Sequence, residues 1–197
     1  MSGLVVRRGK LLVMVEAAAL IDARTLLGMR DDGQRYELVE GVLRMMSPAG
    51  GRHGRVAHSL ALILGTHVRG RQLGLVYAAE TGFVLARGPD TVRAPDVAFV
   101  ARERAVSIDD DEGFVTVVPD LVGEVVSPRD SFSDVEEKVL AWLTAGTRLV
   151  IVVDPSTRTL HAYRGSDQVV VLREGGRLDA GDVVPGLTIA VAELFQG

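Results

Sequence analysis

Two acids and one lysine have the types and the order that metal-assisted phosphodiester cleavage requires. Asp96 follows Pro95 in the segment RAPDVAFV, Glu124 comes later in PDLVGEVVSP, and Lys138 follows in SDVEEKVLAWLTAG. Two carboxylates can hold a Mg²⁺ ion that keeps several waters and also binds phosphate oxygens. A nearby ammonium can position the attacking water or offset negative charge in the transition state.

Lys138 is notable because lysine is scarce in this chain. The chain has 22 lysines and arginines, and only Lys10 and Lys138 are lysines. The segment around Lys138 has helical spacing, with Val139 and Trp142 on its apolar face, and Lys138 borders that face. A structural alternative stays open, because a lysine in such a position commonly extends its ammonium to water.

The alternation of a short predicted strand, 121–126, puts Glu124 on the same face as Val122 and Val126. A carboxylate among apolar side chains is costly unless a cation accompanies it. Asp96 also lies among apolar residues, and two carboxylates brought together repel each other and tend to take up a proton. A divalent cation would keep both ionised, although a structural ion pair with lysine is the competing interpretation.

The elements that position these residues predict an α/β protein with a mixed central sheet. Alternation around Glu40 predicts a β-hairpin, and helical spacing follows from about residue 50. Ser133 with Glu136 predicts a capping box that opens a helix ending at Gly146. The β-branched segment RLVIVVDP then predicts a buried strand, so strand, helix and strand form a parallel βαβ unit. Segments LVYAAETGFVL, APDVAFV, TLHAYR and QVVVL predict further strands.

Length and composition favour one globular domain. We assign residues 21–197 to it and residues 1–20 to an N-terminal extension with a strand around Leu11–Val15. No apolar stretch approaches the roughly 18 residues of a membrane span, and Glu16 interrupts the one segment that imitates a signal peptide, so we expect a cytoplasmic protein without membrane contact. A net charge of −4 counts against a dedicated nucleic-acid binder, but a bound cation can compensate an acidic site.

Several blocks resemble a known family. RYELVEG, SPAGGRHGRVAHSLALIL, RAPDVAFV, VPDLVGEVVSP, EEKVLAWLTAGTRLVIVVDP and VPGLTIAVAELF are similar, in order, to the Uma family of restriction-like endonucleases. That family is part of the PD-(D/E)XK nuclease superfamily, and the resemblance covers about residues 22–195. It implies a restriction-endonuclease-like core flanked by helices with extra β-hairpins. It also implies hydrolysis of DNA that depends on Mg²⁺, with Mn²⁺ as a possible substitute.

The same resemblance implies roles for individual residues. Asp96 matches the acid of the PD element, Glu124 matches the second acid, and the backbone carbonyl of Val125 would complete the metal ligands. The superfamily pattern places its lysine at position 126, where this chain has Val126. Lys138, on the following helix, would then take over that role by reaching back to the same point.

Further candidates lie in two segments. Glu37 and Glu40 could supply an additional metal ligand, with Glu40 ahead, and an ordinary turn or edge-strand acid is the alternative. His53 begins a helix and could contact a phosphate or the site, or could be a hydrogen-bonded structural histidine. The same helix carries basic residues that could track a phosphate backbone, although a solvated face is favoured: Arg52, Arg55, Arg69 and Arg71.

Two classes of function follow. The first is a Mg²⁺-dependent DNA endonuclease, as a homodimer that cuts both strands of a two-fold-symmetric duplex. The alternative is a catalytically inactive nuclease-fold protein that binds or assembles, linked to defence or mobile elements; the acidic charge favours it. A third option is an enzyme that acts on RNA or on a small phosphodiester.

Overall fold

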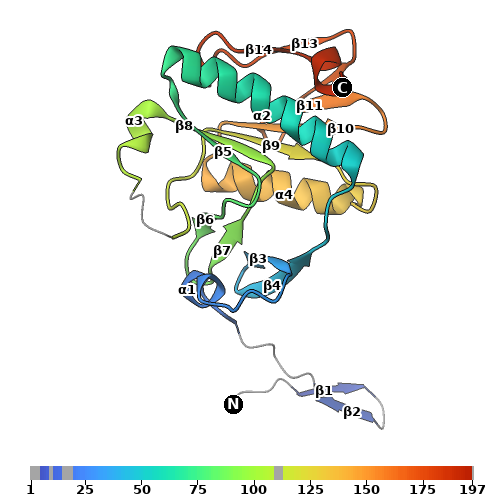
Figure 1. Cartoon of the computed structure of the whole chain (residues 1–197). Coiled ribbons are helices and arrows are strands. Elements are labelled where there is room, and N and C mark those ends of the chain that lie inside the picture. Colours follow the sequence, from blue (N-terminus) through green and yellow to red (C-terminus); the bar gives the residue numbers. More distant parts are fainter. Residues whose placement is uncertain (1–4, 9–10, 15–19, 109–112, 197) are drawn as a thin grey trace.

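A six-stranded mixed sheet forms the centre of the protein, as the computed structural model of residues 5–8, 11–14, 20–108 and 113–196 shows (Figure 1). Only β9 and β10 are parallel, and every other neighbouring pair in this sheet is antiparallel. The predicted mixed sheet is therefore confirmed. In spatial order the strands are β12 (Gln168–Arg173), β11 (Thr159–Gly165), β10 (Leu149–Asp154), β9 (Leu121–Val125), β8 (Val97–Ala101) and β5 (Gly74–Ala78).

Helix α4 (Phe132–Ala145) connects the two parallel strands, so the predicted strand–helix–strand unit is present. The expected capping box at Ser133 and Glu136 is wrong by two residues. Ser131 is the N-cap instead. Its side chain accepts a hydrogen bond from the backbone N–H of Asp134, and the Asp134 carboxylate accepts one from the backbone N–H of Ser131. Aspartate at the third helical position serves here as glutamate does in the usual box. The helix ends at Gly146, as predicted, in a left-handed conformation with φ of 110°.

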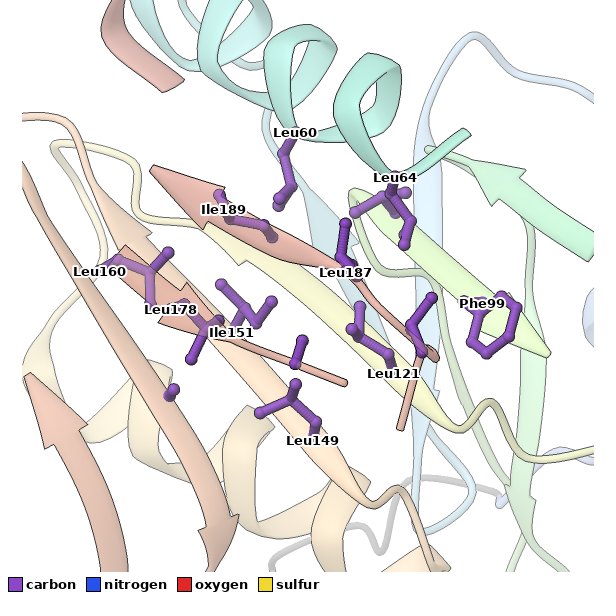
Figure 2. Close-up of a cluster of buried hydrophobic side chains, with 14 of the residues drawn as sticks. Leu60, Leu64, Phe99, Leu121, Leu149, Ile151, Leu160, Leu178, Leu187 and Ile189 are labelled. Carbon is purple, nitrogen blue, oxygen red and sulfur yellow. The ribbon is translucent and has the colours of Figure 1, made fainter. Parts of the chain in front are cut away.

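The two faces of the sheet pack against different helices (Figure 1). Helix α2 (Gly51–Arg71) covers one face together with the C-terminal segment, which holds β13 (Arg177–Asp179), β14 (Thr188–Ala190) and the 3₁₀ helix η1 (Val191–Phe195). Figure 2 shows the apolar side chains that meet there, among them Leu60, Leu121, Ile151, Leu160 and Ile189. Helix α4 covers the other face, where Trp142 and Val139 pack against the sheet.

A second, four-stranded sheet lies beside the first in the order β4-β3-β7-β6, with bounds β4 (Val42–Met46), β3 (Arg35–Val39), β7 (Thr91–Arg93) and β6 (Phe83–Ala86). The hairpin predicted at Glu40 joins β3 to β4; Glu40 and Gly41 both have positive φ, as two-residue hairpin turns require. Segment LVYAAETGFVL does not form one strand. It divides into β5 and β6, which belong to different sheets.

Residues 94–96 link β7 of the second sheet to β8 of the first. This short connection places Asp96 at the junction of the two sheets, directly before β8 begins. Two short helices complete the body. They are α1 (Ala23–Leu27), capped by the Asp22 side chain, and α3 (Arg102–Ala105) after β8.

The N-terminal segment contains an antiparallel hairpin of β1 (Val5–Arg8) and β2 (Leu11–Met14). Strand β2 corresponds to the strand expected around Leu11–Val15, of which Val15 lies outside the described residues. The division into an extension and one domain stays a prediction. Within the described ranges, no helix is both long and apolar enough to cross a membrane.

Candidate active site

A cavity of about 810 Å³ opens where the two sheets, the start of α2 and the start of α4 meet. Asp96, Glu124 and Lys138 all line it, together with Glu37 and His53. The described side chains around it include seven carboxylates and five lysine or arginine groups, so the cavity is acidic overall. The basic ones are Arg35, Arg44, Arg93, Arg129 and Lys138; the acidic ones are Glu37, Glu80, Asp96, Glu124, Asp130, Asp134 and Glu137.

Glu124 is buried on the α4 face of β9, where alternation predicted it. Its Oε1 accepts a hydrogen bond of 2.9 Å from the indole Nε1 of Trp142. Its Oε2 lies 3.7 Å from the Nζ of Lys138. Burial raises the pKa of Glu124 to about 7, since the charged form is poorly solvated there, and the attraction of Lys138 offsets this only in part. The groups around Glu124 therefore stabilise its ionised form poorly.

Lys138 projects from α4 towards the end of β9, so the geometry agrees with a lysine that reaches back from the helix. The negative charge of Glu124 is the main cause that raises the pKa of Lys138, against the opposing effect of burial. Lys138 is therefore an ammonium at neutral pH. Val126, at the position where the superfamily pattern has lysine, instead packs with the apolar residues beneath α4.

Asp96 is bound to the same strand end. Its Oδ2 accepts a hydrogen bond of 2.7 Å from the backbone N–H of Val125, the residue that follows Glu124. The negative charge of Asp96 also raises the pKa of Glu124, so the two carboxylates face a shared space. Among the described residues, no group donates a hydrogen bond to the second oxygen of Asp96. The structure thus brings Asp96, Glu124 and Lys138 together.

His53, in the first turn of α2, completes one wall of the cavity. Its Nε2 lies 3.2 Å from Oδ2 of Asp96. Interaction with Asp96 is the main cause that raises the pKa of His53, and a hydrogen bond with the Val125 backbone adds to it. The backbone of Val125, whose carbonyl was predicted as a metal ligand, is thus in contact with His53. A role for His53 at the site stays a prediction.

Glu37 lies deeper in the wall, and both of its oxygens are engaged. Oε1 accepts from the backbone N–H of Ala94 at 3.0 Å, and Oε2 accepts from Nη1 of Arg93 at 2.9 Å. Arg93 also binds Glu137 through Nη2 at 2.7 Å. These bonds hold the connection that carries Asp96, so this geometry favours positioning over metal ligation for Glu37.

The sequence did not predict that Arg93, Glu137 and Trp142 would take part in the site. Arg93 offered one signal, because an arginine two residues before the Pro-Asp pair must find carboxylate partners if it is buried. Its side chain is only 6% exposed. Trp142 was identified as a packing residue, but its indole N–H also needs an acceptor when buried. Nothing in the spacing indicated that the acceptor would be Glu124.

Glu40 is not brought to the site. It occupies the exposed β3–β4 turn with φ of 49°, its backbone N–H donates to Thr91, and its side chain does not line the cavity. The turn explains this, because the hairpin extends away from the cavity-lining end of β3. Glu40 as a metal ligand would need a different arrangement of that hairpin.

The four arginines of α2 do not form one patch. Arg52 and Arg55 lie near His53, whereas Arg69 and Arg71 are in the last turn, about 24 Å further along the helix axis at 1.5 Å per residue. All four are exposed. Their contact with DNA stays a prediction. The cationic side chains that line the cavity itself come from β3, β4, β7, the loop before α4 and α4: Arg35, Arg44, Arg93, Arg129 and Lys138.

The donor atoms present suit one kind of metal ion. Within the described residues, no three His, Asp or Glu side chains are arranged as a ready metal cluster. Structural zinc sites need four protein ligands and catalytic ones need three, so they do not fit. Mg²⁺ commonly uses one or two carboxylates together with waters and phosphate oxygens, and Asp96 with Glu124 matches that description. The pKa of Glu124, raised by burial, is consistent with a carboxylate that accompanies a cation.

The mixed sheet with helices on both faces and two acids at the end of its central strands defines a nuclease fold of the restriction-endonuclease kind. The chain belongs to the Uma2 family, described as "putative restriction endonuclease", whose family model matches residues 22–192. A solved structure is also similar, that of a "putative nuclease belonging to DUF820" from Anabaena variabilis ATCC 29413. It has a TM-score of 0.75 and 19% sequence identity, over 89% of this chain and 97% of that one. No curated protein matches.

Proposed function

We propose that this protein is a Mg²⁺-dependent endonuclease that hydrolyses phosphodiester bonds of DNA through a metal-activated water. The observation that carries the proposal is the buried carboxylate of Glu124, with a pKa raised to about 7, facing Asp96 and Lys138 in one acidic cavity. Membership of a nuclease family agrees with it. Burial of the Glu124 carboxylate lowers stability, and a role in metal-dependent chemistry would explain why the chain keeps it.

Asp96 and Glu124, with the carbonyl of Val125, would hold the Mg²⁺ ion, for which Mn²⁺ could substitute. When bound, the ion would activate a water and stabilise negative charge on the phosphate. Hydrogen bonds from the protein already hold both carboxylates in position. The Val125 N–H fixes Asp96, and the Trp142 indole fixes Glu124.

Lys138 would act on the substrate side. Its Nζ lies 3.7 Å from Glu124, longer than a normal hydrogen bond, so the ammonium retains donors for a water or a phosphate oxygen. Such a charge, already held in position, stabilises the transition state without the reorganisation that water would need. His53, beside Asp96, could donate a hydrogen bond to a phosphate oxygen from the same wall.

The test is cleavage of supercoiled plasmid and of single-stranded DNA with Mg²⁺, with Mn²⁺ and with EDTA. We expect cleavage with either ion, none with EDTA, and none in Asp96→Asn. The matched control is Asp154→Asn, since Asp154 accepts hydrogen bonds within a turn and does not line the cavity. Cleavage by Asp96→Asn at the rate of the unmodified protein would refute the assignment.

The second candidate is a catalytically inactive nuclease-fold protein with a binding or assembly role in defence or in mobile elements. The net charge of −4 and the wide spacing of the α2 arginines favour it. It predicts no cleavage under any condition, and no Mg²⁺ binding in a calorimetric titration. Cleavage of RNA alone would instead support the third option, an RNA-specific enzyme.

A homodimer is part of the proposal, because an enzyme with two-fold symmetry can cut both strands of a two-fold-symmetric duplex. The active-site cavity does not itself indicate where two copies would meet. The outer strands of the central sheet are the surfaces to consider.

A further inference from the structure

The two outer strands of the six-stranded sheet differ in how they are covered. Beside β5, helix α3 packs against the strand, and the backbone N–H of Arg102 donates to Leu73 just before β5 begins. Within the described part of the chain, β12 pairs with β11 on one side and with no strand on the other. An outer strand of this kind presents free N–H and C=O groups to any strand that can align with them.

The side chains of β12 are also unusual for an exposed edge. Val169, Val170 and Val171 follow one another and are 47%, 51% and 52% exposed. Soluble proteins usually protect such edges with lysine, proline or a bulge. From Gln168 to Leu172, β12 contains neither lysine nor proline, and the irregularity in its pairing with β11 lies on the β11 side. Both faces of the free edge are therefore apolar.

Geometry restricts how two copies of β12 could pair. In an antiparallel ladder, opposite residues must both direct their backbone groups towards the partner or both direct them away. These directions alternate from one residue to the next along a strand. When two identical strands pair symmetrically, the two-fold axis must therefore pass through a residue position and not between two residues. An axis at Val170 places Val169 opposite Val171 of the second copy, and Gln168 opposite Leu172.

The charges at the ends of β12 select this same register. With the axis at Val170, Asp167, in the turn directly before β12, comes level with Arg173 of the second copy, and symmetry creates this pair twice. An axis moved by one residue loses both pairs. Asp167 and Arg173 are exposed, and neither forms an ion pair with another described residue. Opposite charges directly across an antiparallel pair are favourable.

We infer that β12 is a self-association surface, through which two copies of this chain join antiparallel with the axis at Val170. The result is one continuous twelve-stranded sheet with an active-site cavity in each half. This inference builds on the homodimer part of the proposed function, but it uses neither the metal nor the cleavage chemistry. Measurements of assembly therefore test it separately from the nuclease activity.

Cysteine crosslinking tests the contact directly, because the chain contains no cysteine. Opposite residues in an antiparallel pair have Cα atoms about 4.5 or 5.5 Å apart, within the range that a disulfide spans. Val170→Cys should therefore form a covalent dimer under mild oxidation. Val106→Cys is the control, since Val106 is 83% exposed and lies outside β12. Equal crosslinking of the two variants would overturn the inference.

A charge exchange tests the register by sedimentation velocity at several concentrations. Arg173→Asp or Asp167→Arg alone should weaken the dimer about tenfold, because two attractive pairs become two repulsive ones. The double variant should restore dimerisation, since every pair again joins opposite charges. A protein that is monomeric at all concentrations, or a dimer that is insensitive to these changes, would overturn the inference and leave the nuclease proposal in place.

Discussion

The two faces of strand β9 serve different purposes. On the α2 face, Leu121 and Val125 belong to an entirely apolar core, and Gly123 lies beneath Leu60. On the α4 face, Glu124 is buried among apolar neighbours. Because successive residues point to opposite sides, a five-residue strand holds a packed core on one face and the candidate active-site carboxylate on the other.

The two faces of β9 contribute differently to the stability of the protein. The α2 face gains from apolar burial at each of its positions. The α4 face gains stability from the burial of Val122 and Trp142, but it also buries Glu124. Burial raises the pKa of Glu124 to about 7, because the ionised carboxylate is poorly solvated there. Changes on the α2 face should therefore alter stability, and changes at the cavity should alter activity.

The largest expected effect is on the cavity side. Lys138→Ala should slow cleavage by roughly 10²–10³-fold, as loss of one positioned charge-stabilising group commonly does. The concentration of Mg²⁺ at half-maximal rate should change far less, because the carboxylates remain. Single-turnover rates over a Mg²⁺ titration measure both quantities, and Leu140→Ala, an exposed change on the same helix, is the control. Equal losses in rate and in metal affinity would make Lys138 a structural partner of Glu124.

On the α2 face, Ile151→Ala should lower the free energy of unfolding by about 2–5 kcal/mol, because a fully buried side chain leaves a cavity. Urea denaturation followed by tryptophan fluorescence measures this change. The cleavage rate per folded molecule should remain that of the unmodified protein. A large fall in that rate with little loss of stability would show that the two faces are not separate in function.

A smaller loss is expected for Gly123→Ala. A Cβ at this position would come within 2.5 Å of Cδ2 of Leu60 and 2.6 Å of Cγ1 of Val97. Those side chains would have to shift, at a cost of about 1–3 kcal/mol in unfolding free energy. The same urea experiment measures it. Unchanged stability would mean that α2 moves away from the sheet more easily than its packing indicates.

A further effect concerns pH. The folded-state pKa of Glu124 is raised above the ordinary glutamate value of 4.5, so its contribution to stability is present at low pH and is lost as pH rises through about 7. The metal-free protein should therefore lose stability from this group between about pH 4.5 and 7. Glu124→Gln should not show that loss, and the difference between the two urea-derived pH profiles isolates it. If stability depended on pH in the same way in both proteins, the ionised form of Glu124 would be stabilised better than its burial suggests.

Much of the fold followed from local patterns. Alternation identified the faces of β9, and the helical apolar spacing identified the side of α4 that packs on the sheet. The start of α4 was misplaced because Ser131 and Ser133 both fit a capping pattern, and only the folded chain selects Ser131. The division of LVYAAETGFVL between two sheets was also beyond local pattern, since sheet membership depends on distant partners.

For the site, the sequence indicated which residues meet but not what holds them. Asp96, Glu124 and Lys138 were predicted and are brought together. Their supports could not be predicted, because the bonds from Trp142 to Glu124 and from Val125 to Asp96 depend on how strands and helices cross. Glu37 was one candidate for an additional metal ligand, and the bond network with Arg93 that engages it becomes visible only in three dimensions.

The most direct test of the central claim is the thermal unfolding of the unmodified protein and of Glu124→Gln at pH 8, with and without Mg²⁺. Glutamine keeps an acceptor for the Trp142 indole but removes the charge. We predict that Glu124→Gln unfolds at a higher temperature without metal, and that Mg²⁺ raises the unfolding temperature of the unmodified protein alone. A variant that is less stable than the unmodified protein, yet is still stabilised by Mg²⁺, would contradict the account.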